Sequence, residues 1–134
     1  MGGAKKIDHL GIAVHDLARS EALFQALLGV APAGREVVAS ELVEVSFFRV
    51  GESAFELLMP TSPTSPIAKA LEKRGEGIHH VGYRVDDCAA ALERVKAQGH
   101  QVIDDAPRPG SRGTTVAFIH PKTAFGTLIE LVQE

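Results

Sequence analysis

The hydrophobic positions of this chain form two similar runs, each opening with a strand pattern that leads into a helix pattern. Residues 7–14 are mostly apolar and β-branched, which predicts a strand. Residues 17–28 carry leucine and phenylalanine at helical spacing, follow Asp16 as a helix cap and stop at Gly29. The pattern then predicts strands at 35–39, 42–50 and 54–59, with a hairpin turn at 51–53 between the last two.

The second run repeats this plan after a linker at 60–66 that is rich in proline, serine and threonine. Pro66 begins a short helix that Gly75 ends. The elements expected after it are a strand at 78–85, a helix capped at Asp86 or Asp87 and ended by Gly99, and strands at 101–104, 114–119 and 127–132. Each run therefore reads β-α-β-β-β, which predicts an α+β protein built from two tandem modules.

We expect one domain over residues 1–134, with module one at about 5–60, a linker and short helix at 61–76, and module two at about 77–134. The net charge of -3 gives no basic footprint, so we expect no nucleic-acid partner. The single Cys88 excludes an intrachain disulfide and fits a reducing cytosol. No apolar run has the length of a membrane span and nothing resembles a signal peptide, so we expect no membrane partner and a cytoplasmic location.

The two modules carry candidate metal ligands at matching places. His9 and His80 lie 71 positions apart on the first strands, and Glu56 and Glu130 lie 74 positions apart on the last strands. Both glutamates are flanked by apolar residues, so their burial without a partner would be costly. If the modules pack about a pseudo-twofold axis, the four side chains meet in one cleft.

Two imidazoles and two carboxylates suit a divalent cobalt, manganese, zinc or nickel ion, and the lack of thiolate argues against a structural zinc site. Taken singly, a strand histidine is more often structural and a strand glutamate is more often a rim charge. Their recurrence in both modules favours the metal site. The remaining histidines are expected to be surface or capping residues: His15, His79, His100 and His120.

These segments resemble the vicinal oxygen chelate superfamily, which includes glyoxalase I, extradiol dioxygenases, fosfomycin-resistance enzymes and methylmalonyl-CoA epimerases. The resemblance is strongest to the epimerases and covers nearly the whole chain. The segments that carry it are 7–14 (IDHLGIAV), 56–60 (ELLMP), 65–68 (SPIA), 77–81 (GIHHV) and 116–122 (VAFIHPK).

The resemblance implies a curved mixed sheet around a metal cleft and an isomerase of propionyl-CoA metabolism. The implied metal is a divalent ion, typically cobalt, held by His9, Glu56, His80 and Glu130. The implied reaction interconverts (R)- and (S)-methylmalonyl-CoA by α-proton abstraction and reprotonation through a metal-stabilised enolate. Glu130 resembles a residue proposed for one of the acid–base roles, and family habit suggests a homodimer.

The sequence departs from the epimerases at the other acid–base residue. Counting back from Glu56 places Ser40 on the family's glutamate and leaves Glu41 one position off, and a one-residue slip in a strand reverses the face. A bulge or a shifted strand start would restore Glu41, which we take as the second catalytic carboxylate. Glu44 has the parity of Ser40 and is the alternative; both glutamates could also be solvent-facing charges.

Substrate contacts are expected from four polar side chains. Arg84 follows the metal strand and could hold the substrate carboxylate, with a rim salt bridge as the alternative. Ser111, Arg112 and Lys122 could meet the phosphates of an acyl-CoA.

Three other functions of this superfamily can be weighed against the epimerase. A glyoxalase-type isomerase would use the same ligands, but no glutathione site is identifiable. The additional carboxylate Glu56 argues against an extradiol dioxygenase. A non-catalytic module that binds an acyl-CoA or another small ligand is favoured by the displaced base at Ser40 and Glu41, since fold alone does not fix function.

Overall fold

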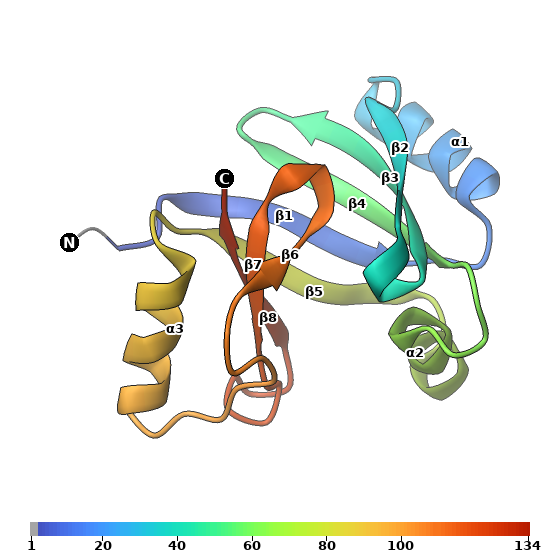
Figure 1. Cartoon of the computed structure of the whole chain (residues 1–134). Helices are drawn as coiled ribbons and strands as arrows, with labels where there is room; N and C mark the ends of the chain where they lie inside the picture. The colour runs from blue at the N-terminus through green and yellow to red at the C-terminus, as the bar shows by residue number, and fades with distance from the viewer. Residues whose placement is uncertain (1–2) are drawn as a thin grey trace. The chain divides into compact units, whose positions relative to one another are not determined.

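The computed structural model describes residues 3–134, which divide into two compact units. The first unit comprises residues 10–79, and the second unit comprises residues 3–9 together with 80–134. Strands β1 (Lys6–Ala13) and β5 (Gly77–Arg84) each contribute one end to each unit (Figure 1). Each unit is described by itself.

The first unit is built on antiparallel strands. Hydrogen bonding gives the order β2-β3-β4-β1-β5, and β2, β3 and β4 pair antiparallel in succession. Helix α1 begins after Asp16, whose side chain accepts from the Arg19 amide, and it ends at Gly29 with a left-handed φ of 71°, as predicted. The unit's other elements are α1 (Leu17–Leu28), β2 (Gly34–Val38), a 3-10 turn (Ala39–Glu41), β3 (Val43–Val50), β4 (Ser53–Pro60) and α2 (Pro66–Arg74).

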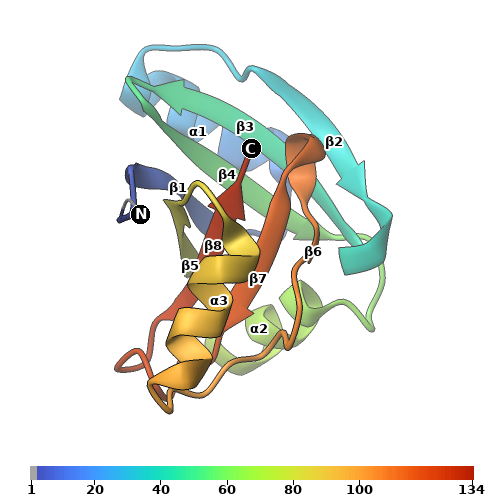
Figure 2. The same ribbon diagram turned by 60° about the vertical axis from the view of Figure 1, so that its left-hand side comes forward.

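Side chains of β3 alternate between two hydrophobic clusters. Val45 and Phe47 pack with residues of β4 and α2, whereas Phe48 packs with Leu57 and the start of α1. Helix α1 contacts β3 and β4, as Figure 2 shows. The apolar stripe predicted for α1 is only partly core, because Leu23 is 57% exposed and Leu27 is 66% exposed. The stripe is wider than the face that the strands cover.

The second unit contains a mixed sheet with the order β1-β5-β8-β7-β6. Strands β5 and β8 pair parallel, and β7 pairs antiparallel with β8. Cys88, Ala91 and Leu92 of α3 are buried in one cluster with residues of β7 and β8. The cap of α3 is Asp87, whose side chain accepts from the Ala90 amide. The elements are α3 (Cys88–Ala97), β6 (Arg108–Pro109), a 3-10 turn (Ser111–Gly113), β7 (Thr115–Ile119) and β8 (Leu128–Gln133).

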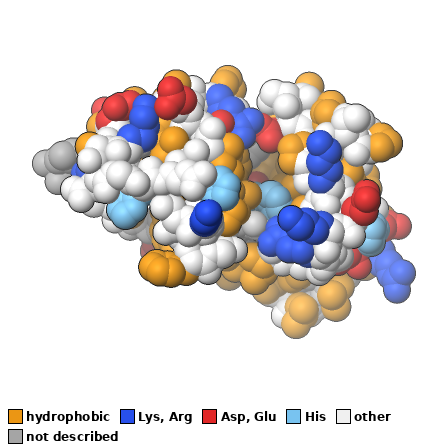
Figure 3. Space-filling model, turned by 90° about the horizontal axis from the view of Figure 1, so that it is seen from below, with side chains coloured by type: hydrophobic (Ala, Val, Ile, Leu, Met, Phe, Trp, Pro, Cys, Tyr) orange, Lys and Arg blue, Asp and Glu red, His pale blue; other side chains and the backbone are white. Residues whose placement is uncertain are grey.

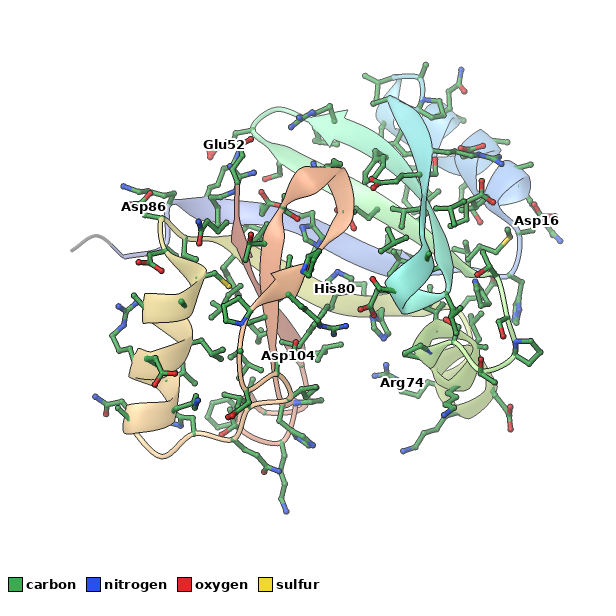
Figure 4. The ribbon with its side chains drawn as sticks, viewed as in Figure 1. Asp16, Glu52, Arg74, His80, Asp86 and Asp104 are labelled. Atoms are coloured by element: carbon green, nitrogen blue, oxygen red, sulfur yellow. The ribbon has the colours of Figure 1, made fainter. Side chains whose placement is uncertain are left out.

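The strand predicted at 101–104 is wrong. Only Val102 forms an isolated bridge, to Ile119. The amides of Ile103 and Asp104 both donate to the carbonyl oxygen of Phe118, at 3.0 and 3.2 Å, and two consecutive amides on one oxygen cannot extend a ladder. The carboxylate of Asp104, which is labelled in Figure 4, accepts from the Phe118 amide at 2.8 Å. The edge strand is the short β6 (Arg108–Pro109) instead.

The α+β class predicted from the sequence is confirmed, since both units combine strands with packed helices. Among residues 3–134, no helix is long and apolar enough to cross a bilayer, and the longest, α1, has 12 residues. Some hydrophobic side chains are exposed, and Figure 3 shows them interspersed with charged ones. Phe125, in the turn between β7 and β8, is fully exposed and has a positive φ of 58°.

Candidate metal centre

Three of the predicted metal ligands converge within the second unit. His9 comes from β1, His80 from β5 (Figure 4) and Glu130 from β8. The Oε1 atom of Glu130 lies 2.8 Å from His9 Nε2 and 3.1 Å from His80 Nε2. The two Nε2 atoms are 2.9 Å apart. The parallel register that places Glu130 beside Gly82 brings its carboxylate to the histidines.

The three side chains are buried and electrostatically coupled. His9 is 2% exposed, His80 is 5% exposed and Glu130 is 7% exposed. Burial alone would raise the pKa of Glu130, but hydrogen bonds and charge from His80 and His9 outweigh it and lower the pKa from 4.5 to about 2. Glu130 is therefore an anion at neutral pH. The ring of Phe118 packs edge-on against His80, with centroids 5.8 Å apart.

Gly82 provides the space for the His9 imidazole. A Cβ atom built on Gly82 would touch His9 Cε1 and would lie 2.7 Å from Nδ1 and 3.0 Å from Nε2. Real Cβ atoms essentially never approach below 3.0 Å. A glycine at position 82 of β5 therefore has a steric reason, which is the His9 ring on the adjacent strand β1.

The donor set fits a divalent ion. Metal–nitrogen and metal–oxygen bonds of about 2.1 Å that meet at right angles separate the donor atoms by about 3 Å. The three separations of 2.8, 2.9 and 3.1 Å match this geometry. Imidazole nitrogen with carboxylate oxygen suits cobalt, manganese, zinc or nickel.

Sequence reasoning missed Asp8, which is 3% exposed and directly precedes His9. Its Oδ2 atom lies 2.7 Å from His9 Nδ1, and its Oδ1 atom accepts from Arg84 Nε at 2.9 Å. Burial raises the pKa of the Asp8 carboxyl, but His9 and Arg84 outweigh burial and hold that pKa far below its usual range. The available signal was an aspartate between the apolar residues Ile7 and Leu10, next to a candidate ligand.

The structure brings two of the four predicted substrate contacts together. Arg84 binds Asp8 and also pairs with Glu134 at 3.0 Å. Arg112 Nη2 lies 3.4 Å from Asp8 Oδ2, and Ser111 precedes Arg112 in the 3-10 turn before β7. Lys122 is exposed in the turn that follows β7, whereas Arg112 lies in the turn that precedes β7.

The remaining candidate carboxylates belong to the first unit. Glu56 is 4% exposed on β4, opposite Phe47 of β3. Glu41 is half-buried and ends a 3-10 turn in which Ser40 is exposed. Because this turn precedes β3, strand parity does not govern residues 40 and 41. Glu44 lies on β3, where its carboxylate is 3.9 Å from Arg35 Nη1.

The other histidines occupy turn or surface positions. His120 Nδ1 accepts from the Lys122 amide at 3.0 Å, which fits the surface or capping role predicted for these histidines. His15 and His100 are exposed, and the His15 amide donates to Glu76 at 2.9 Å. His79 is half-buried at the start of β5.

Comparison with known proteins gives a consistent result. The Glyoxalase/Bleomycin resistance protein/Dioxygenase superfamily matches residues 8–118. The ethylmalonyl-CoA/methylmalonyl-CoA epimerase of Cereibacter sphaeroides is 38% identical over 130 residues, which cover 96% of this chain and 97% of that protein. The mitochondrial methylmalonyl-CoA epimerase of Homo sapiens is 33% identical over 129 residues, covering 96% and 73%. The structure of Streptomyces coelicolor methylmalonyl-CoA epimerase in complex with 2-nitronate-propionyl-CoA matches with a TM-score of 0.94 at 34% identity, covering 98% and 96%.

The chain therefore belongs to the Glyoxalase/Bleomycin resistance protein/Dioxygenase superfamily, the class of protein to which its fold and buried ligand set point. The relatives that match it along nearly its whole length include methylmalonyl-CoA epimerases. The resemblance drawn from the sequence is confirmed, and so is the enzyme class, an isomerase of the epimerase type.

Proposed function

We propose that this protein is a metal-dependent epimerase that interconverts (R)- and (S)-methylmalonyl-CoA. The observation that carries the proposal is the convergence of His9, His80 and Glu130 at mutual distances of 2.8 to 3.1 Å. The epimerases that match along nearly the whole chain also support the proposal. The substrate class is accordingly a small acyl-CoA with an acidic α-proton.

We propose Glu56 as the fourth ligand, which its burial and its place equivalent to Glu130 support. The proposed ion is cobalt, with manganese, zinc and nickel as alternatives that the same donors accept. When bound, such an ion supplies Lewis-acid polarisation of the thioester oxygen.

Two carboxylates are proposed to move the proton, Glu41 and Glu130. One carboxylate takes the α-proton as the C–H bond breaks, and the other carboxyl delivers a proton to the opposite face, so the centre inverts. The reverse reaction exchanges the two roles. The low pKa of Glu130 keeps this carboxylate ionised at neutral pH, which is the state in which it can accept the α-proton. The 3-10 turn supports Glu41, since it frees this residue from the parity of β3.

The substrate-binding residues are proposed to be Arg84, Ser111, Arg112 and Lys122. A guanidinium has five donors, so an arginine that binds Asp8 retains donors for a substrate carboxylate or phosphate. Lys122 is exposed and would meet the CoA moiety as a point charge.

We also propose a homodimer and a cytoplasmic location. The resemblance to a family of homodimers supports the dimer. The single, buried Cys88 supports a reducing compartment.

Deuterium uptake at the α-carbon of methylmalonyl-CoA tests the proposed activity. The cobalt-loaded protein in heavy water should exchange the α-proton with loss of stereochemical purity, and His80→Ala should abolish the exchange. Glu41→Gln should slow exchange by about 100-fold or more, which is the usual contribution of a general acid or base. Glu44→Gln is the matched control on the adjoining strand and should stay within about twofold of wild type, because its partner is Arg35.

The outcomes separate the competing functions. Substrate binding without deuterium uptake would replace the epimerase by a binding module. Loss of exchange in Glu44→Gln, with Glu41→Gln unaffected, would move the second acid–base role to Glu44. Failure both to bind and to exchange would reject methylmalonyl-CoA as the ligand.

A further inference from the structure

The Asp8 carboxylate occupies a position that has no counterpart in the second module. At the 71-residue offset that relates His9 to His80, the residue matching Asp8 is His79. Asp8 is 3% exposed, and its Oδ2 atom is 2.7 Å from His9 Nδ1. The residue that precedes the second-module histidine is not a carboxylate, so the internal repeat does not explain the contact between Asp8 and His9.

A carboxylate at Nδ1 fixes which ring nitrogen of His9 carries the proton. When Nδ1–H donates to Asp8, Nε2 is the nitrogen whose lone pair would bind a metal ion, once the Nε2 proton that faces Glu130 in the metal-free protein is lost. Nε2 is the atom that faces Glu130 Oε1 at 2.8 Å and His80 Nε2 at 2.9 Å. The hydrogen bond also sets the ring orientation, which Gly82 allows by having no Cβ atom. Asp8 thus presents the His9 lone pair to the ligand cluster.

Two arginines hold the Asp8 carboxylate in place. Arg84 donates from Nε to Oδ1 at 2.9 Å, and Arg112 Nη2 lies 3.4 Å from Oδ2. Without such partners a buried carboxylate would be strongly unfavourable. The two cations come from different elements, β5 and the 3-10 turn before β7, so the network ties this turn to the ligand strands.

The turn that delivers Arg112 is itself held by local hydrogen bonds. Arg112 has a left-handed φ of 56°, which is unfavourable for a residue with a side chain. The Thr114 hydroxyl donates to the Ser111 carbonyl at 2.7 Å, and the Gly110 amide donates to the Thr114 carbonyl at 2.9 Å. A strained residue fixed in this way brings its guanidinium within 3.4 Å of the buried Asp8 carboxylate, which indicates that the contact is built into the fold.

We propose that Asp8 is the positioning residue for His9, and that Arg84 and Arg112 act through Asp8 to set the affinity of the centre for its metal ion. This inference rests on the proposed metal site, but it does not depend on which acyl-CoA the protein uses. Residues that orient a metal-binding histidine typically affect metal affinity by about 10- to 100-fold.

Titration of the full-length, metal-free protein with cobalt chloride tests this role by a readout other than activity. Asp8→Asn removes the charge at nearly constant shape and should raise the dissociation constant for cobalt by about 10- to 100-fold. It should also change the visible absorption spectrum of the cobalt protein, because the His9 ring turns. The matched control is Asp104→Asn, another aspartate of this unit that pairs with an arginine, Arg108 at 3.1 Å. It should keep both the spectrum and the dissociation constant of wild type.

Arg112→Ala keeps the proposal testable if Asp8→Asn does not fold. This variant retains the Asp8 carboxylate and should weaken cobalt binding by about threefold to tenfold. The effect should be smaller than that of Asp8→Asn, because Arg112 acts on His9 only through Asp8. Wild-type affinity and spectrum in a folded Asp8→Asn protein, or in Arg112→Ala when Asp8→Asn is unfolded, would overturn the proposal. A wild-type protein that binds no cobalt would overturn it too. Cobalt binding that depends on Asp8 in a protein without α-proton exchange would leave the positioning role standing and reject the proposed function alone.

Discussion

The His9 ring occupies the space that a side chain at Gly82 would fill, because a Cβ atom at position 82 would lie 2.7 Å from His9 Nδ1 and 3.0 Å from His9 Nε2. Glu130 lies beside Gly82 in the parallel register of β5 and β8. Gly82 thus lies on β5, between β1, which carries His9, and β8, which carries Glu130. The contact makes a steric prediction that is independent of any assumption about the substrate.

Gly82→Ala should weaken binding of a divalent ion by at least about tenfold and lower the thermal stability. The new methyl group would lie within 3.0 Å of both ring nitrogens, so His9 has to move, and overpacking of this kind typically costs about 1 to 3 kcal/mol. Isothermal titration with cobalt and a thermal melt measure the two effects. Gly3→Ala is the control, because a Cβ atom there has nothing within 4 Å. Wild-type metal affinity in Gly82→Ala would mean that His9 is not a ligand.

Cobalt should stabilise the wild-type protein and leave His80→Ala unaffected. A ligand that binds only the folded state at 100 times its dissociation constant contributes about 2.7 kcal/mol, which corresponds to roughly 10 °C for a chain of this size. Differential scanning calorimetry with and without a chelator measures the shift. His15→Ala, which changes an exposed histidine outside the cluster, should retain it. An equal shift in His80→Ala would place the ion elsewhere.

Acid should destabilise the metal-free protein through Glu130. The folded-state pKa of this group is lowered from 4.5 to about 2, so its contribution to stability is complete above pH 4.5 and is lost as the pH falls towards 2. Urea unfolding of the metal-free protein between pH 6 and pH 2 should therefore show a decline that is shallower in Glu130→Gln. If the stability of the two proteins declined in parallel with pH, the histidines would not be lowering the pKa of the Glu130 carboxyl group.

The sequence singled out His9, His80 and Glu130 as candidate ligands because the internal repeat places a histidine and a glutamate at equivalent positions in each module. Asp8 escaped prediction because it lies one residue from His9, and strand alternation assigns neighbours to opposite faces. A short side chain that bonds to the adjacent ring is a local geometry that alternation does not describe. Counting residues along β3 likewise could not place Glu41, since the 3-10 turn and the left-handed Leu42, with a φ of 53°, intervene.

Element boundaries were predictable where capping chemistry is explicit. Asp16, Gly29, Pro66 and Gly75 lie where the sequence indicated. The 101–104 segment was mispredicted because its apolar and polar alternation resembles a strand while its amides converge on a single carbonyl. The α1 stripe shows the same limit, as periodicity identifies an apolar face without showing how much of it another element covers.

Phe125→Gly should stabilise the protein by about 0.5 to 1 kcal/mol. A left-handed backbone conformation is unfavourable for a residue with a Cβ atom, whereas glycine adopts it without this penalty. The phenylalanine is fully exposed and has a φ of 58°, so its removal sacrifices no buried area. Chemical denaturation gives the change in the free energy of unfolding. Phe125→Ala removes the ring but keeps the Cβ atom, and it should leave that free energy within about 0.5 kcal/mol of wild type. If both variants lose stability equally, the exposed ring itself makes a stabilising contact, and the backbone argument fails at this turn.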